Sequence, residues 1–231
     1  MDYPSKIRIN EVVLRDGLQL EKKIVSIEEK VLLFNRLKNA GIESFEFGSF
    51  VHPARVPQMA NSGELYSEIK QTAGSTNLIA LVPNLKGAKR AAQLGVKKIN
   101  YVFSASDTHN LQNVQKSTLQ SVDELQRIND FCLENTLSLD VSIATSFGCP
   151  FEGQIPIERV QSIVQQITRF EIDVLTLADT TGMANPKGVF QLVSLVCSEF
   201  PNQKFNLHFH NTRGMGLSNI LGRYQCRSYQ F

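Results

Sequence analysis

Short apolar runs alternate with longer amphipathic segments along most of the chain. The short runs are rich in β-branched residues or alternate apolar with polar residues, and both patterns are typical of strands. The longer segments repeat apolar residues three and four positions apart, which is typical of helices. The pattern predicts strands over residues 6–14, 43–47, 77–82, 98–103, 137–143, 172–177 and 204–210. It predicts helices over residues 64–71, 85–94, 117–135, 156–170 and 186–199, and an earlier one that Gly41 closes.

The ends of several predicted helices carry their own signals. Ser26 is followed three residues later by Glu29, which is the capping box that begins a helix. Pro156 and Pro186 stand in the first turn of their helices, where proline is favoured. The polar segments between elements are expected to be loops. They cover residues 48–59, 104–116 and 147–153.

Alternating strands and helices indicate a parallel sheet, either an open doubly wound sheet or a (β/α)8 barrel. No GxGxxG motif follows the first strand, so a nucleotide-binding open sheet loses its main support. Polar residues instead gather just after the strands, where the active sites of barrels lie. These residues are Arg15, Asp16, Glu46, Asn84, Asp179, His208 and His210. The sequence therefore favours an α/β fold of the (β/α)8 TIM barrel type.

The number of predicted strands is about seven, so the barrel is expected to be incomplete, with the eighth βα unit missing. Residues 215–221 begin a plausible helix, but residues 222–231 are polar and aromatic without a helical stripe. We interpret residues 1–221 as an incomplete barrel domain and residues 222–231 as an aberrant tail. The chain would then be a truncated or frame-shifted product.

Composition and charge exclude several classes of protein. The 231 residues are 42% hydrophobic and carry a formal net charge of +2, which calls for neither nucleic acid nor an anionic membrane. The chain has no apolar run long enough to span a bilayer, and residues 1–10 lack a signal core. The cysteines form no CxxC pair and no disulfide framework, so a cytoplasmic location is expected. They are Cys132, Cys149, Cys197 and Cys226.

His208 and His210 are the first candidates for chemistry. Side chains two apart on a strand point the same way, so both imidazoles would project together, with Phe209 on the other side. Two imidazoles and a carboxylate can bind one divalent metal, and Asp16, at the end of the first strand, is the candidate carboxylate. Taken alone, an HxH pair is more often a hydrogen-bonded or surface pair than a metal site, and the other motifs of the chain are what favour the metal.

Six motifs in order along the chain resemble those of 3-hydroxy-3-methylglutaryl-CoA lyases. They are NEVVLRDGLQ (10–19), FEFGSFVHPARVPQM (45–59), PNLKG (83–87), FGCPFEG (147–153), ADTTG (178–182) and HFHNTRG (208–214). The family belongs to a wider group of metal-dependent TIM-barrel lyases and Claisen-type synthases. The resemblance covers about residues 6–221. It implies retro-Claisen cleavage of a CoA thioester to acetoacetate and acetyl-CoA.

The resemblance also implies roles for individual residues. Asp16, His208 and His210 would hold a divalent cation, with Mg²⁺ or Mn²⁺ preferred although the donors also accept Co²⁺ or Zn²⁺. Arg15 would hold the thioester carbonyl and stabilise the enolate. Two acidic residues at the mouth, Glu46 and Asp179, would handle protons or support the site, while Asn84 and Lys86 would line the approach of CoA. The implied partner is a CoA thioester, and a homodimer is allowed.

Several of these residues also have a simpler interpretation. Arg15 and Asp16 could form an ion pair at a strand end, and Glu46 and Asp179 could cap loops. Cys149 is a tempting nucleophile, but a buried structural thiol is the preferred interpretation. The remaining histidines, His52 and His109, stand in polar segments and are expected to face solvent.

The chain departs from the family in two respects. It ends before the family's Gly-rich loop, which holds a cysteine thought to protonate the enolate and an asparagine that completes the metal shell. It also has Asn211 and Arg213 where some relatives have Asp and Tyr. Weak metal binding and slow or absent turnover are therefore expected. The alternatives are a Claisen-type synthase of the same barrel group, working in the condensing direction, and a non-catalytic fragment.

Overall fold

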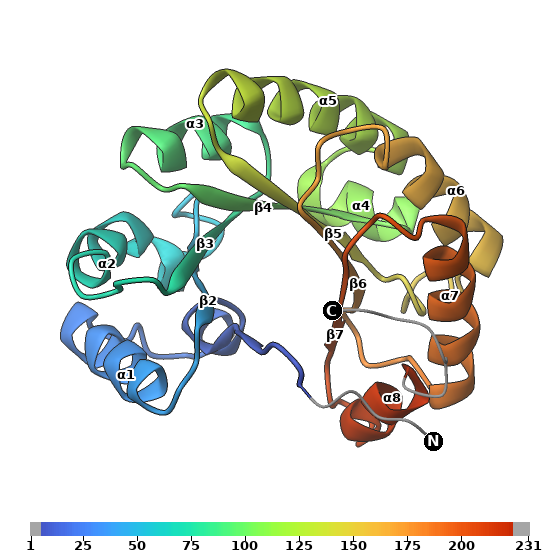
Figure 1. Ribbon diagram of the computed structural model, residues 1–231, viewed down its shortest axis with the longest axis horizontal. Coiled ribbons are helices and arrows are strands. Elements are labelled where there is room, and N and C mark those ends of the chain that lie inside the picture. The colour runs from blue at the N-terminus through green and yellow to red at the C-terminus, as the bar shows by residue number, and fades with distance from the viewer. Residues whose placement is uncertain (1–5, 224–231) are drawn as a thin grey trace. The chain divides into compact units, whose positions relative to one another are not determined.

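The computed structural model describes residues 6–223, in which strands and helices alternate along the chain (Figure 1). The strands are β1 (Asn10–Glu11), β2 (Ser44–Ser49), β3 (Asn77–Val82), β4 (Lys98–Ser104), β5 (Ser138–Ala144), β6 (Val174–Asp179) and β7 (Phe205–Phe209). The helices are α1 (Ile27–Asn39), α2 (Ser62–Ile69), α3 (Leu85–Gln93), α4 (Asp107–Val114), α5 (Thr118–Glu134), α6 (Ile157–Ile167), α7 (Pro186–Glu199) and α8 (Gly216–Arg223). Two short turns are also helical, the π-helical η1 (Val13–Gly17) and the 3-10 turn η2 (Pro57–Met59).

The strands follow one another in the order of the chain, from β1 to β7. β2 pairs with β1 and with β3 in parallel, and β6 pairs in the same way with β5 and with β7. Parallel strands added one by one in chain order are expected when every βα unit winds in the same direction. The predicted parallel α/β architecture is confirmed.

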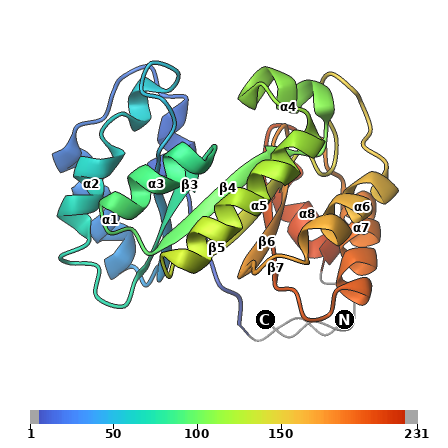
Figure 2. The ribbon, with the colours of Figure 1, turned by 90° about the horizontal axis from the view of Figure 1, so that it is seen from above.

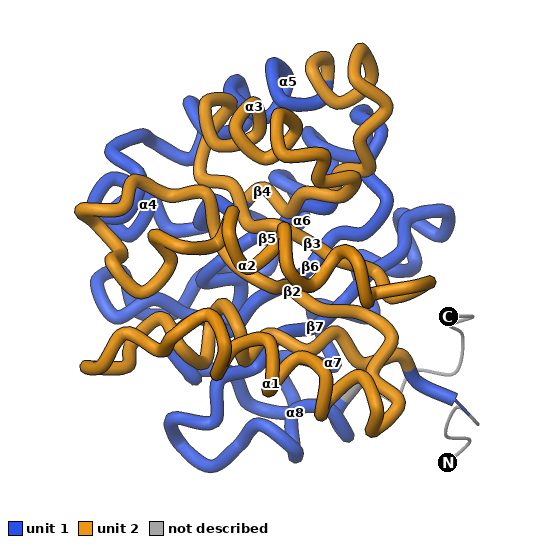
Figure 3. Tube along the Cα trace, turned by 90° about the vertical axis from the view of Figure 1, so that its left-hand side faces the viewer, with its two compact units in different colours: residues 1–7, 102–129, 140–231 blue, residues 8–101, 130–139 orange. Residues whose placement is uncertain are grey.

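The chain divides into two compact units, which are coloured separately in Figure 3. The N-terminal unit consists of residues 8–101 and 130–139, and the C-terminal unit of residues 1–7, 102–129 and 140–231. β4 and β5 begin in the N-terminal unit and end in the C-terminal unit. A backbone hydrogen bond joins these strands or their flanks in each unit, from Ser138 N to Lys97 O in one and from Ala105 N to Ala144 O in the other.

Aromatic side chains form the core of the N-terminal unit. Phe34 of α1 packs on Phe45 of β2 with ring centroids 4.8 Å apart, and Phe47 stacks on Tyr66 of α2 at 5.1 Å. All four are buried, so the β2 side chains that alternate with them face the opposite side of the strand. One of those alternating residues is Glu46, which the strand therefore presents away from the helices.

Aliphatic side chains form the core of the C-terminal unit, where α6 packs against α7 (Figure 2). Val160, Val164, Val189 and Val196 are all fully buried. The helix boundaries follow the predicted signals, because Pro186 occupies the first turn of α7 and Asn185 caps that helix by accepting a hydrogen bond from Gly188 N. The predicted capping box of Ser26 and Glu29 is also present, at the start of α1 in the other unit.

The first predicted strand, 6–14, is wrong in most of its length, because only Asn10 and Glu11 are paired as β1. The Glu11 carboxylate accepts a hydrogen bond from Val13 N at 2.8 Å. The backbone N–H groups of Arg15, Asp16 and Gly17 then all donate to the Val12 carbonyl, which winds the chain into η1. Local hydrogen bonds of this kind compete with the sheet and override β-propensity.

The predicted loop over 104–116 is also wrong, because it contains the helix α4. Ser106 begins this helix by accepting a hydrogen bond from His109 N, and Gln115 ends it in the left-handed conformation at φ 59°. The segment is too polar for its apolar positions to form a visible stripe. Ser106 was the available signal in the sequence, because serine is favoured at the residue that caps the start of a helix.

The C-terminal helix was predicted over 215–221 and is present as α8, which continues to Arg223. Residues from 224 onwards lie outside the described part, so the division into a domain 1–221 and a tail 222–231 stays a prediction. Of the helices between residues 6 and 223, none is both long enough and apolar enough to cross a membrane.

Candidate functional site

The N-terminal unit presents Arg15 and Asp16 on η1, directly after β1. Arg15 Nη1 donates to Asp16 Oδ1 at 2.6 Å, and Arg15 Nε donates to Glu46 Oε1. The three side chains are at most 20% exposed. The expectation of an Arg15–Asp16 ion pair is therefore met, and the structure adds a second carboxylate to the pair.

Glu46 lies inside β2 and not after it, and it is 2% exposed. Its second oxygen, Oε2, accepts a hydrogen bond from Asn100 Nδ2 of β4 at 2.8 Å. Asn100 was not foreseen from the sequence, although an amide in an otherwise apolar strand is a signal of buried hydrogen bonding. Glu46 thus has a hydrogen-bond partner on each oxygen, and it does not cap a loop.

Asn84 and Lys86 stand together at the start of α3. Asn84 is the N-cap, and its side-chain oxygen accepts a hydrogen bond from Gly87 N at 2.9 Å. Lys86 is exposed in the first turn of the helix. The sequence predicted that both residues follow a strand, and in the structure they follow β3. The side-chain oxygen of Asn84 is used to cap α3.

The C-terminal unit brings His208 and His210 together at the end of β7, as the alternation of strand side chains predicts. Their ring centroids are 4.9 Å apart, and the two Nε2 atoms are 3.1 Å apart. Phe209 points to the other side of the strand and packs on Phe147 at 5.6 Å. Both imidazoles therefore offer the same nitrogen to the same small volume.

Asp179 ends β6 beside this pair and is fully buried. Its Oδ1 accepts hydrogen bonds from Met183 N at 2.7 Å and Ala184 N at 3.1 Å, while Oδ2 has no hydrogen-bond partner among the described residues. Burial raises the pKa of Asp179, against the opposing effects of these two N–H groups and of the nearby His210 and Arg213. A buried carboxylate oxygen without a partner needs an explanation, and substrate contact is one.

Arg213 follows β7 on the HFHNTRG motif and is exposed. Its Nη1 donates to the carbonyls of Thr181 at 3.0 Å and Gly182 at 2.8 Å. Gly182 has a positive φ of 63°, and a Cβ there would come within 2.7 Å of Thr212. Glycine is therefore required for the loop to approach the Arg213 segment this closely.

Cys149 and His109, both in the C-terminal unit, each donate a hydrogen bond to Ser106. Cys149 is fully buried, and its Sγ donates to Ser106 Oγ at 3.0 Å, which supports the interpretation as a structural thiol. The expectation that His109 faces solvent is wrong. Its Nδ1 lies 2.6 Å from Ser104 Oγ, and burial lowers its pKa against the opposing charge of Glu152.

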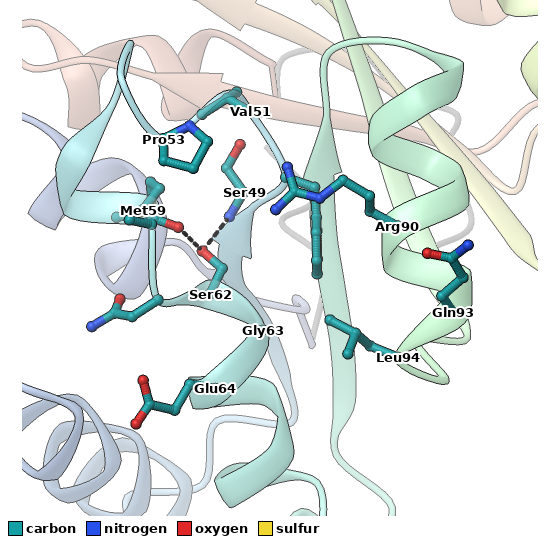
Figure 4. Close-up of a pocket in the computed structure, with 13 residues that line it drawn as sticks. Ser49, Val51, Pro53, Met59, Ser62, Gly63, Glu64, Arg90, Gln93 and Leu94 are labelled. Carbon is teal, nitrogen blue, oxygen red and sulfur yellow. Dashed lines mark hydrogen bonds between the residues drawn. The ribbon is translucent and has the colours of Figure 1, made fainter.

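A pocket of about 360 Å³ lies in the N-terminal unit beyond the end of β2 (Figure 4). Phe50, Met59, Ser62 and Leu94 are among the residues that line it. Arg90 extends across it from α3, with its guanidinium 5.9 Å from the centre of the Phe50 ring.

Parallel strands in chain order with ionisable side chains at their carboxyl ends are typical of enzymes of the (β/α) barrel class. The HMGL-like family model matches residues 6–225. Hydroxymethylglutaryl-CoA lyase YngG from Bacillus subtilis is 37% identical over 96% of this chain and 74% of its own length. An (R)-citramalyl-CoA lyase from Chloroflexus aurantiacus is 36% identical over 95% of this chain and 72% of its own length.

One solved structure is an HMG-CoA lyase from Acinetobacter baumannii in complex with coenzyme A and 3-methylmalate. It superposes with a TM-score of 0.89 at 41% identity and covers 95% of this chain and 71% of the other. The chain therefore belongs to the HMGL-like family. Its relatives of known name are carbon–carbon lyases, and the predicted barrel fold and family are confirmed.

Proposed function

We propose that this protein cleaves 3-hydroxy-3-methylglutaryl-CoA, or a close 3-hydroxyacyl-CoA, to acetoacetate and acetyl-CoA. The observation that carries the proposal is the match to named lyases across nearly the whole chain, at 37% identity for the Bacillus relative. In the reaction the tertiary hydroxyl loses its proton and becomes the ketone of acetoacetate. The C–C bond breaks, its electron pair forms the enolate of acetyl-CoA, and that enolate takes a proton on carbon.

Asp16, His208 and His210 are the proposed ligands of a divalent cation, Mg²⁺ or Mn²⁺. They offer one carboxylate and two imidazoles, a donor set that can hold a metal ion. The histidines fit this role because their Nε2 atoms are only 3.1 Å apart and share one volume. When bound, the cation would act as a Lewis acid for the oxygens of the substrate.

Arg15 is proposed to hold the thioester carbonyl. Glu46 accepts a hydrogen bond from its Nε and Asp16 one from its Nη1, so the second N–H of Nη1 and both N–H groups of Nη2 are the donors left for a substrate oxygen. Two carboxylates fix the plane of the guanidinium before substrate arrives, and a fixed donor needs no reorganisation as negative charge develops.

Asp179 and Glu46 are proposed to handle protons, and their surroundings suit different tasks. Glu46 is bonded on both oxygens, to Arg15 and Asn100, which suits an anion that orients its neighbours. Asp179 keeps Oδ2 without a partner among the described residues, and burial raises its pKa. Asp179 is therefore the better candidate to exchange a proton with the substrate.

Asn84 and Lys86 are proposed to line the approach of CoA. Lys86 presents an exposed ammonium group at the first turn of α3, which suits the phosphates of CoA. Asn84 uses its oxygen as the helix cap, so only its amide nitrogen would face the ligand.

The experiment is a coupled assay for acetoacetate with purified protein and added Mg²⁺ or Mn²⁺. Acetoacetate should form from 3-hydroxy-3-methylglutaryl-CoA, and the His208→Ala variant should form it more than about 100-fold more slowly. The second arm of the experiment tests a panel of related acyl-CoA thioesters. It is included because an (R)-citramalyl-CoA lyase is 36% identical to this chain. Absence of cleavage for every thioester, with metal present and the protein folded, would refute the proposal.

A further inference from the structure

Lys30 of α1 is a buried lysine that the chemistry above does not use. It is 2% exposed, and burial lowers its pKa. Its Nζ donates to the Gln58 carbonyl at 2.9 Å and to Asn61 Oδ1 at 2.7 Å. A buried ammonium costs free energy unless its hydrogen bonds offset the loss of water, so these two bonds stabilise Lys30 in this position and fix the segment that accepts them.

The first connection leads from Lys30 to the end of β2. Gln58 and Asn61 flank Met59, whose carbonyl accepts a hydrogen bond from Ser62 Oγ at 2.8 Å. Ser62 Oγ in turn accepts one from Ser49 N at 3.0 Å, as the dashed lines in Figure 4 show. Ser49 is the last residue of β2, the strand that carries Glu46.

The second connection leads to the segment that follows Asp16. The side chain of Gln58 donates from Nε2 to the Glu21 carbonyl at 2.6 Å. Residues 20–24 of this segment are all exposed, including Leu20 at 86%. The bond from Gln58 is therefore an anchor for a segment with little burial of its own.

The segment after β2 packs closely against the strand on one side and borders a pocket on the other. A Cβ on Gly48 would lie 2.5 Å from Ser62 Oγ, so Ser62 is held tightly against the strand. The pocket of about 360 Å³ borders Ser49 and Ser62 from another direction. The position of this segment therefore depends on these polar anchors together with the buried side chains of Phe50 and Met59.

We propose that Lys30 is a positioning residue, which holds the segments after Asp16 and after Glu46 in place through Gln58 and Ser62. The effect of Lys30 on turnover rests on the proposed function, because the residues it would help to position are Arg15, Asp16 and Glu46. The hydrogen bonds themselves do not depend on any activity.

Limited trypsin digestion tests the proposal without substrate. Each segment carries its own exposed cleavage site, Lys22–Lys23 in the first and Arg55 in the second. Lys30→Met should speed cleavage at both by roughly tenfold, because cleavage follows the population of the open segment. Arg169, exposed in the C-terminal unit, is the internal reference and should keep its rate.

Two further variants separate the connections. Gln58→Met should speed cleavage at Lys22–Lys23 more than at Arg55, and Ser62→Ala should do the reverse. Lys38→Met is the matched control, because Lys38 also lies on α1 but donates to the Thr72 carbonyl. Equal acceleration at all sites including Arg169, or no acceleration in any variant, would overturn the proposal. If Lys30→Met does not fold, the other two variants still decide.

Turnover provides the second readout. Lys30→Met should lower kcat by about tenfold at a protein concentration and temperature where it is fully folded, whereas Lys38→Met should not. An inactive parent protein would refute the proposed function and leave the digestion result standing. An active parent with unchanged digestion in Lys30→Met would refute the positioning role alone.

Discussion

The two units build their ionisable clusters in opposite ways. In the N-terminal unit Glu46 has a partner on each oxygen, and Arg15 joins Glu46 to Asp16. In the C-terminal unit the Asp179 carboxylate is fully buried, yet one of its oxygens has no partner among the described residues. Two imidazole nitrogens face each other nearby at 3.1 Å.

The difference separates charged groups that are bonded to one another from a buried carboxylate oxygen that has no partner among the described residues. Opposite charges that satisfy one another hold a fixed geometry, which suits Arg15 as a donor to substrate. A buried carboxylate with an unsatisfied oxygen is costly until a proton or a substrate donor is bound to it. Arg15 and Glu46 should therefore act mainly through orientation and Asp179 through proton transfer, while Asp16 also joins the histidines as a proposed metal ligand.

The largest effect is expected in the imidazole pair. His208→Ala removes one of the two nitrogens and should lower both Mn²⁺ affinity and kcat/KM by more than about 100-fold, the upper range for loss of a supporting group. Calorimetric titration with Mn²⁺ and the acetoacetate assay measure the two quantities. His52→Ala, at an exposed histidine of the other unit, is the control. Undiminished Mn²⁺ affinity in His208→Ala would show that the pair is not a metal site.

The next effect is expected in the charged cluster of the N-terminal unit. Arg15→Lys keeps the charge but loses the fork that reaches Glu46 and Asp16 together. We expect kcat/KM to fall by about 100-fold, comparable with the loss of one preorganised donor. Arg36→Lys, on the exposed face of α1, should have no effect. A normal kcat/KM in Arg15→Lys would mean that charge alone suffices and that orientation is not the function of this cluster.

A smaller effect is expected for Asp179→Asn, which should lower activity but not the free energy of unfolding at neutral pH. Burial raises its pKa above the usual 3.8. Between that value and the raised pKa the folded state binds more protons than the unfolded state, so the free energy of unfolding falls as pH rises through the window. Asp179→Asn should abolish this fall, be at least as stable at neutral pH, and lose activity.

Chemical denaturation at several pH values, in the absence of metal, measures the effect. Asp123→Asn, on the exposed face of α5, should keep the slope of the parent protein. A slope that survives in Asp179→Asn would assign the pH dependence to another group. Lower stability of that variant at neutral pH would mean that the carboxylate contributes more by its hydrogen bonds than its burial costs.

The sequence predicted the regular elements better than the contacts that make the clusters. β3 and α7 were predicted at their observed bounds, because an apolar run that ends at a proline and a proline in the first turn of a helix are local signals. η1 was missed because its shape depends on the Val12 carbonyl receiving three N–H groups. No residue type in the sequence predicts that one carbonyl will accept hydrogen bonds from three N–H groups.

The candidate residues divide in the same way. The proximity of His208 and His210 follows from the two-residue period of a strand, so sequence sufficed. The bond of Glu46 to Asn100 joins residues 54 positions apart and depends on the packing of separate strands. The same holds for Lys30, whose acceptors lie 28 and 31 residues away. A lysine in an amphipathic helix gives no sign in sequence that it is buried.

The smallest effect is expected at Arg213, whose bonds act on the second cluster from outside. It donates to the carbonyls of Thr181 and Gly182, directly before the N–H groups of Met183 and Ala184 that hold Asp179. Arg213→Gln should lower kcat/KM by about threefold to tenfold and barely change stability, since interactions of an exposed charge contribute about 1 kcal/mol or less. Lys187→Gln, exposed at the start of α7, is the control. A much larger loss would mean that Arg213 contacts the substrate itself, and the second cluster would then contain a cation of its own.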